Sequence, residues 1–177
     1  MKIVAFGAST SQFSINQQFA HFAAHQFDAE INMIDLNDFE MPVFSVDKQN
    51  ENGFPDEAYE FHEIIESADF LVVSMTEHNG SYSAAFKNTL DWCSRLNNDV
   101  FHEKPMLLLS TSPGRLGAKF VLEAALSRFP RHTANILGHF SLPSFGENFK
   151  DGIINEELKK EFDDLVENVK ETLAKIK

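Results

Sequence analysis

The sequence is short of cysteine, of cations and of long apolar runs, and each shortage excludes a class of protein. Its single cysteine, Cys93, allows no internal disulfide bond, which is consistent with a reducing compartment. It has 15 lysines and arginines against 27 acidic residues, a formal net charge of −12, which argues against a nucleic-acid binder and against docking on anionic membranes. The apolar run Lys2–Gly7 is too short for a signal peptide or a membrane span. We therefore expect a cytoplasmic protein.

Several catalytic and binding motifs are also missing. There is no G-x-G-x-x-G pattern and no Gly-Lys-Ser/Thr ending, which argues against a Rossmann dinucleotide site and a Walker-type nucleotide site. His21 and His25 are spaced for one helix face, but they lack a third ligand and an H-E-x-x-H pattern, so we expect a solvated face and no metal site. Cys93 is expected to be a small core residue and not a nucleophile. Trp92 is expected to pack at the edge of its helix or at an interface.

What the sequence does have is a regular alternation of apolar runs and helical periods. Apolar runs predict five strands, at Lys2–Gly7, Glu30–Leu36, Asp69–Met75, Pro105–Ser110 and within Ala134–Leu142. Helical spacing predicts five helices, at Ile15–Phe27, Asp56–Ser67, Phe86–Cys93, Phe120–Phe129 and Leu158–Ile176, the last with Asn155 as its N-cap. Two polar segments are predicted to be loops, Asn37–Pro55 and Thr76–Tyr82.

This order of elements predicts an α/β protein. Its 177 residues fit one domain, spanning residues 1–177. Strands that alternate with helices imply a doubly wound, five-stranded parallel sheet of order 2-1-3-4-5, with helices on both faces in three αβα layers. In such a sheet ligands bind outside the carboxyl ends of the strands. The loops after the first, third and fourth strands are therefore the place to look for a site.

The first of these loops contains four hydroxyl groups immediately before a helix. It reads Gly7-Ala8-Ser9-Thr10-Ser11-Gln12-Phe13-Ser14-Ile15-Asn16. Free backbone N–H groups and the positive end of a helix dipole suit a phosphate, to which hydroxyl and amide groups add neutral hydrogen bonds. The same residues are also consistent with a simple polar loop in which Ser14 caps the helix.

The second and third loops carry turn residues. In Thr76-Glu77-His78-Asn79-Gly80-Ser81, the pair Asn79-Gly80 favours a tight turn with positive φ, which presents backbone N–H groups to the edge of a flat ring or only caps the next helix. In Ser110-Thr111-Ser112-Pro113-Gly114-Arg115-Leu116-Gly117, the glycines permit close approach to a ligand or form an ordinary strand-to-helix turn.

Taken together, the loops resemble those of the NADPH-dependent FMN reductase family, whose fold is flavodoxin-like, over essentially the whole chain. The first loop is similar to that family's Gly-Ser-x-Arg-x-x-Ser-x-Asn, and the second to its Pro-Glu-Tyr-Asn-Gly-Ser. The run Lys87-Asn88-Thr89-Leu90-Asp91-Trp92 is similar to its Lys-Asn-Ala-Leu-Asp-Trp. Three departures stand out, because Ser11 replaces an arginine, His78 a tyrosine and Thr76 a proline.

The resemblance implies a cofactor site made from all three loops. FMN would be held at its phosphate by Ser9, Ser11, Ser14, Ile15 and Asn16, along its ring by Thr76, Glu77, His78, Asn79 and Gly80, and at its pyrimidine side by Ser112, Pro113 and Gly114. The flavin would carry the chemistry. It also implies NADPH or NADH as co-substrate, a small-molecule acceptor such as a flavin, quinone, azo compound or metal oxyanion, and a homodimer or homotetramer.

Two other hypotheses stay open from the sequence. One is a non-enzymatic electron carrier that binds FMN and docks a basic partner through its acidic surface. The other is a relative of the same fold that has lost FMN and acts as a binding protein, as the missing arginine of the first loop allows.

Overall fold

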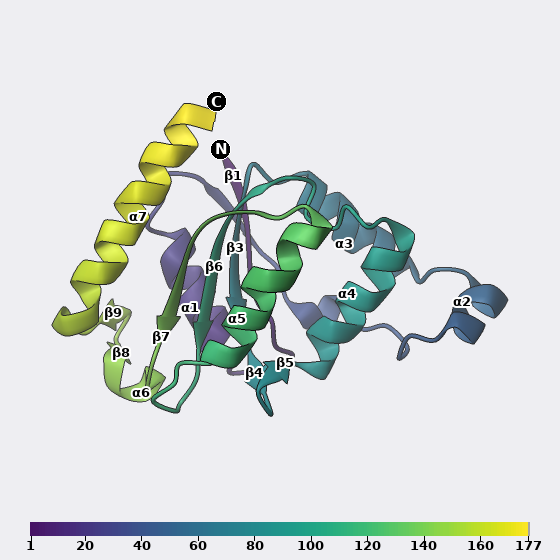
Figure 1. Ribbon diagram of the computed structural model, residues 1–177, viewed down its shortest axis with the longest axis horizontal. Helices are drawn as coiled ribbons and strands as arrows, with labels where there is room; N and C mark the ends of the chain where they lie inside the picture. The colour runs from purple at the N-terminus through teal and green to yellow at the C-terminus, as the bar shows by residue number, and fades with distance from the viewer. Residues whose placement is uncertain (177) are drawn as a thin grey trace.

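The computed structural model describes residues 1–176 and is built around one parallel sheet (Figure 1). The strands are β1 (Lys2–Gly7), β2 (Glu30–Met33), β3 (Phe70–Met75), β6 (Pro105–Thr111) and β7 (Asn135–Leu142). Their order is β2-β1-β3-β6-β7, and every neighbouring pair is parallel. The predicted doubly wound, flavodoxin-like order is therefore confirmed. Within residues 1–176, no helix combines the length and the apolar character needed to cross a membrane.

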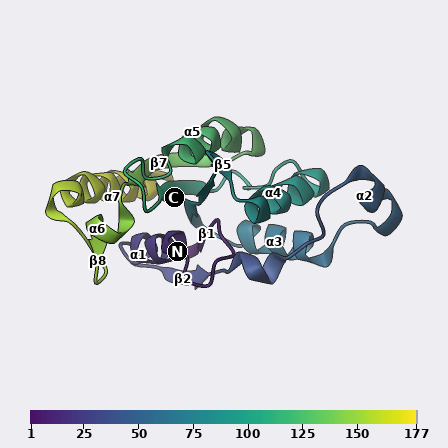
Figure 2. The same cartoon turned by 90° about the horizontal axis from the view of Figure 1, so that it is seen from below.

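Helices cover both faces of the sheet, in three layers (Figure 2). One face packs against α1 (Ile15–Ala24) and α7 (Glu156–Ile176), and the other against α3 (Asp56–Glu66), α4 (Ala84–Leu96) and α5 (Lys119–Arg128). Alternate residues of a strand point to opposite faces. Ile3 therefore lies in the apolar core beneath α1 and α7, and Val4 in the core beneath α3, α4 and α5. Burial on both faces explains why β1, β3 and β6 are nearly continuous apolar runs.

The predicted ends of most elements are close to those of the structure, and the differences have local causes. The second strand ends at Met33, before the predicted Leu36, which instead begins a 3₁₀ helix, η1 (Leu36–Phe39). Pro130 does end α5, and it lies in a following 3₁₀ turn, η2 (Phe129–His132). The Asn155 side chain accepts a hydrogen bond from the Leu158 N–H at 3.1 Å, so its predicted role as the N-cap of the last helix is confirmed.

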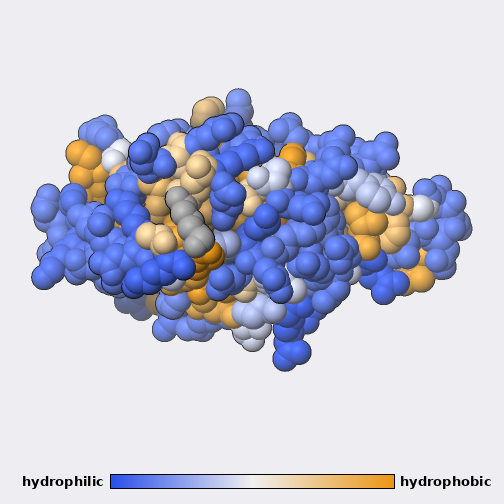
Figure 3. All heavy atoms as spheres, turned by 90° about the horizontal axis from the view of Figure 1, so that it is seen from above, coloured by the Kyte–Doolittle hydropathy of each residue, from blue (hydrophilic) through white to orange (hydrophobic). Residues whose placement is uncertain are grey.

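The predicted loop Asn37–Pro55 was wrong in part, because it contains η1 and the short helix α2 (Val46–Asn52). Ser45 caps the start of α2 by accepting from the Lys48 N–H, and Gly53 ends it at φ 76°. No residue of α2 is buried, and the helix extends away from the rest of the molecule in Figures 1 and 2. Hydrophilic residues cover most of the face in Figure 3; one of its few apolar areas lies at the end that carries α2.

Side chains of α4 fix the base of this projecting segment. The Asn88 amide donates to the carbonyls of Met41 and Pro42, and its oxygen accepts from the Phe44 N–H. The Trp92 Nε1 donates to the Pro42 carbonyl at 2.7 Å, and its ring is buried. The family-like run in α4 therefore anchors a surface segment, and the predicted packing role of Trp92 is confirmed.

Three short elements near the C-terminus were not predicted from the sequence. They are the helix α6 (Phe145–Asn148) and the two strands of a hairpin, β8 (Phe149–Lys150) and β9 (Ile153–Ile154). Asp151 and Gly152 form its turn, both with positive φ.

Candidate functional site

The loops after β1, β3 and β6 line one cavity of about 330 Å³ at the carboxyl edge of the sheet. The three strands are neighbours, so their ends lie side by side. The cavity is lined by Ser9, Ser11, Phe13, Ser14, Ile15, Asn16, Thr76, Glu77, His78, Thr111, Ser112 and Pro113. The predicted site residues that do not line it are Asn79, Gly80 and Gly114, which follow directly in the same loops. The structure therefore brings the three predicted loops together.

Two lining residues, Phe13 and Thr111, were not predicted as site residues. Thr111 is the last residue of β6, so its place at a strand end was the signal that could have identified it. Phe13 interrupts a polar loop and is 82% exposed although it borders the cavity. A single apolar residue in a loop belongs to no helical or strand pattern, so the sequence alone does not indicate that it borders a cavity.

The first loop leaves hydrogen-bond donors at the start of α1. The Ser14 hydroxyl oxygen accepts from the Gln17 N–H at 3.1 Å, so its predicted capping role is confirmed, and the Ser9 oxygen accepts from the Ser11 N–H at 3.1 Å. Because both oxygens act as acceptors here, their O–H hydrogens are left to donate to a ligand. The first turn of α1 carries no acidic residue. Its positive end therefore suits an anion.

Gly7 allows α1 to begin this close to β1. A Cβ atom at this position would lie 2.4 Å from the Gln17 nitrogen, a backbone atom that cannot move aside. The Gly7 N–H donates to the Gln17 side chain at 2.6 Å, and the same side chain donates to the Ile34 carbonyl. A glycine is therefore required where the first loop leaves the strand.

The Asn16 side chain joins the ends of two strands beneath the cavity. Its oxygen accepts from the Ser74 hydroxyl at 2.7 Å and from the Thr111 N–H at 3.1 Å, and its amide donates to the Thr111 carbonyl at 3.1 Å. Asn16 is buried, so these bonds are made away from water. Only one amide hydrogen remains, and the main role of this side chain is to position the loops.

The second loop is a hairpin of β4 (Glu77–His78) and β5 (Ser81–Tyr82). Its two turn residues, Asn79 and Gly80, have φ of 51° and 74°, so the predicted tight turn with positive φ is confirmed. The Glu77 carboxylate accepts from the Val121 N–H at 2.9 Å, in the first turn of α5. That helix has no side-chain cap of its own, so Glu77 supplies the missing acceptor and fixes the hairpin to α5.

The third loop is tied to the end of β7. The Thr111 hydroxyl donates to the Leu142 carbonyl at 2.7 Å, and the Ser112 carbonyl accepts from the Phe145 N–H at 3.0 Å. Gly117 has a φ of 59°, and a Cβ atom there would lie 2.4 Å from the Ser141 hydroxyl. These contacts leave Ser112 and Pro113 at the cavity wall.

Hydroxyl, amide and titratable side chains share the wall of the cavity with the apolar residues Phe13, Ile15 and Pro113, and no lysine or arginine is among its described lining residues. Its titratable side chains are Glu77 and His78. The Thr76 hydroxyl is buried without a hydrogen-bond partner. Such a wall suits a ligand with an anionic group at the α1 end and further hydrogen-bond acceptors elsewhere.

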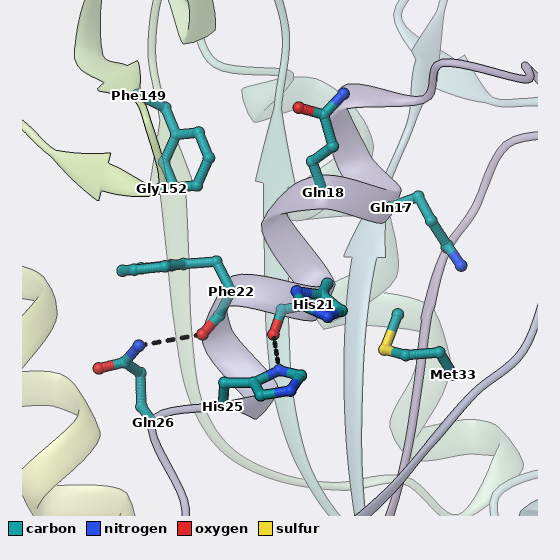
Figure 4. A pocket seen from close by; sticks show the side chains of 9 residues that line it. All are labelled: Gln17, Gln18, His21, Phe22, His25, Gln26, Met33, Phe149 and Gly152. Atoms are coloured by element: carbon teal, nitrogen blue, oxygen red, sulfur yellow. Dashed lines mark hydrogen bonds between the residues drawn. The ribbon is translucent and has the colours of Figure 1, made fainter.

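A larger cavity lies elsewhere and offers no comparable chemistry (Figure 4). It measures about 590 Å³ and lies between α1 and the β8–β9 hairpin. His21 and His25 lie in its wall with ring centroids 4.1 Å apart; the pKa of His21 is lowered by burial and by the nearby His25. Residues 1–176 hold no group of three His, Cys, Asp or Glu side chains that could bind a metal ion. None of the three strand-end loops lines this cavity beyond the start of α1.

Comparisons with known proteins bear on the family of the chain. The family model described as NADPH-dependent FMN reductase matches residues 1–147. A quinone reductase of Escherichia coli (strain K12) is 28% identical over 126 residues, which are 66% of this chain and 67% of that protein. An NADPH azoreductase of Bacillus sp. (strain OY1-2) is 25% identical over 170 residues, 96% of this chain and 91% of that protein.

Among solved structures, the flavoenzyme NAD(P)H:(acceptor) oxidoreductase FerB from Paracoccus denitrificans superposes with a TM-score of 0.71. The match covers 96% of this chain and 97% of that one at 20% sequence identity. At that identity the superposition supports the fold alone.

Proposed function

Because the chain belongs to the NADPH-dependent FMN reductase family, we propose that it oxidises NADPH or NADH with bound FMN and reduces a small acceptor. The observation that supports this most strongly is the convergence of three loops on one cavity whose wall contains the start of α1 and residues of the β4–β5 hairpin. FMN supplies the hydride-transfer chemistry when bound, while the protein supplies position and electrostatics.

The residues present fit FMN. The hydroxyls of Ser9, Ser11 and Ser14 and the backbone N–H groups of Ile15 and Asn16 would hold the phosphate at the start of α1. Thr76 contributes a buried hydroxyl that has no partner in the protein. The remaining proposed contacts are along the ring, from Glu77, His78, Asn79 and Gly80, and at its pyrimidine side, from Ser112, Pro113 and Gly114.

Two of these residues already use their side chains inside the protein, which supports binding through their backbone. Since the Glu77 carboxylate caps α5, Glu77 would face the ring through its backbone. Since the Asn16 amide is used between strand ends, Asn16 would serve the phosphate through its backbone N–H. Backbone N–H groups of the second and third loops would stabilise the negative charge that the ring gains on reduction.

The acceptor that we propose is a quinone, an azo compound or a free flavin. Relatives named quinone reductase and NADPH azoreductase support the first two classes. The net charge of −12 is less favourable for a metal oxyanion, since it repels anions.

We further propose one functional unit spanning residues 1–177, located in the cytoplasm and active as a homodimer or homotetramer. Exposed apolar side chains near the cavity support an assembly, because Phe13, Leu116 and Phe120 lie in or next to the first and third loops. Light scattering on the purified protein tests the oligomeric state.

The first test of the function is the visible spectrum of the FMN-reconstituted protein, recorded anaerobically before and after NADPH is added. Retained yellow colour that bleaches, and returns when a benzoquinone is added, is the expected result. Retained colour that neither NADPH nor NADH bleaches would favour an electron carrier instead. A protein that retains no flavin would contradict both readings.

A further inference from the structure

Two hydroxyl groups within residues 1–176 are buried without a hydrogen-bond partner, and they differ in location. Thr76 is 9% exposed and lines the candidate cavity, directly after β3. Tyr82 is not among the residues that line that cavity, and its ring packs against Phe86 and Phe129 at centroid distances of 5.8 and 6.3 Å. A buried hydroxyl without a partner destabilises the folded protein. Such a group at a cavity wall calls for an explanation.

The position of Thr76 indicates that it would contact a part of the ligand other than its anionic group. The donors suited to a phosphate, Ser9 and Ser14, belong to the first loop and the start of α1. Thr76 is on another strand end and is followed at once by the hairpin β4–β5. Its hydroxyl is covered as it stands, but threonine has alternative staggered χ1 positions that exchange its hydroxyl and methyl groups. Such a rotation can present the hydroxyl to the cavity.

We propose that the Thr76 hydroxyl donates a hydrogen bond to an acceptor atom of bound FMN outside its phosphate, and that it thereby makes flavin affinity depend on a group which is unsatisfied in the protein alone. This inference rests on the proposed function. The contact is particular to this chain, because the similar loop of the resembled family has a proline at this position, which has no hydroxyl.

The proposal predicts that one variant gains stability without flavin and loses affinity for FMN. Thr76→Val keeps the branched shape but removes the hydroxyl, so the flavin-free protein loses an unsatisfied buried group and its Tm should rise by about 2–4 °C. The flavin complex loses a hydrogen bond, so the Kd for FMN should rise about tenfold. A purely structural role would instead raise or lower stability and FMN affinity together, or leave the affinity unchanged.

The test is a titration of each purified variant with FMN, followed by quenching of flavin fluorescence, with Tm measured in the absence of flavin. Thr76→Ser keeps the hydroxyl and should retain FMN affinity within about twofold. Tyr82→Phe removes the other unpartnered hydroxyl and keeps the ring, so it is the control for stability and should raise the Tm by a similar amount. Riboflavin, which lacks the phosphate, should lose the same factor of affinity as FMN in Thr76→Val.

Three outcomes would overturn the inference. If wild-type protein binds FMN and Thr76→Val binds it equally well, this inference fails while the proposed function stands. If affinity falls for FMN but not for riboflavin, the hydroxyl contacts the phosphate, and the assignment is wrong. If wild-type protein binds no FMN, the inference and the proposed function fail together.

Discussion

Single side chains around the cavity combine a structural contact with a capacity to bind a ligand. The Ser14 oxygen completes the start of α1, and its O–H hydrogen is left to donate. The Asn16 amide holds two strand ends, and the backbone of the same residue lies at the start of the helix. A substitution here therefore affects stability and binding together, and only a matched control separates the two.

Ser14→Ala should weaken FMN binding by a factor of about 10 or more, because a hydrogen bond to a charged phosphate contributes roughly 1.5–3 kcal/mol. It should also cost about 1 kcal/mol of stability through the lost cap. Ser45→Ala removes an equivalent cap from α2, far along the chain from the cavity, and is the control. Urea unfolding and FMN titration measure both effects. Equal FMN affinity in the two variants would contradict the phosphate assignment.

Cys93 should be unreactive in the folded protein. Burial raises the pKa of its thiol to about 12 from an ordinary value of 9.0, so the reactive thiolate is scarce at neutral pH. Because the folded pKa is raised, the contribution of this group to stability is present below pH 9.0 and is lost as the pH rises from there towards 12. A thiol reagent at pH 8 should label unfolded protein in urea at once and native protein slowly. Fast labelling of native protein would disprove this.

The sequence predicts residue roles well where both partners are local. Ser14 as a cap and Asn79-Gly80 as a turn follow from spacing within a few residues. The partners of the Asn16 side chain lie 58 and 95 residues away, and the acceptor role of Glu77 joins groups 44 residues apart. No spacing rule can reveal such pairs, because they exist only after the strands are ordered.

At the scale of elements, the hairpin β4–β5 and the helix α5 form one support for the cavity. The residue before the helix, Ala118, has a left-handed conformation with a φ of 62°, and its side chain cannot cap the helix. The Glu77 carboxylate provides both the acceptor and the negative charge that this end of the helix lacks. The position of the hairpin therefore depends on α5, and the stability of the first turn of α5 depends on the hairpin.

Glu77→Ala should lower the free energy of unfolding by about 1 kcal/mol and speed hydrogen exchange at the Val121 amide. Glu77→Gln keeps an acceptor but not the charge, so its loss should be smaller. Native-state hydrogen exchange, read residue by residue, measures both variants. Unchanged exchange at Val121 in Glu77→Ala would show that the contact does not stabilise the helix.

Long elements with strong patterns were predicted, and short ones were not. The buried strands β1, β3 and β6 read as continuous apolar runs, and α7 as a long amphipathic period. The short helix α2 buries no residue, so it carries no apolar face by which sequence reading could find it. The strands of the β8–β9 hairpin have two residues each, too few for any alternation to be visible.

For the whole molecule, the balance of charge should govern how anionic ligands bind. The net charge is −12, and no lysine or arginine is among the described residues that line the cavity. Neutral donors must therefore hold a phosphate against a repulsive field, which salt screens.

The affinity for FMN should consequently increase by a factor of a few as the salt concentration rises from about 20 to about 200 mM. The affinity for riboflavin, which lacks the phosphate, should hardly change. Fluorescence titrations of both flavins at each salt concentration measure the difference. Weaker FMN binding at higher salt would instead point to a cation that reaches the phosphate, and Arg115 in the third loop would be the first to replace with alanine.

The bonds made by Asn16 also bear on the order of events during folding. This side chain bonds to residues that lie 58 and 95 positions further along the chain, so its three hydrogen bonds form only when β3 and β6 are aligned beside the first loop. A shift of one residue in β3 would remove the Ser74 hydroxyl from this buried amide, and a shift in β6 would displace the Thr111 backbone groups. Flavin binding would therefore occur late in folding. In a refolding experiment, the quenching of flavin fluorescence should follow the recovery of the helical circular dichroism signal.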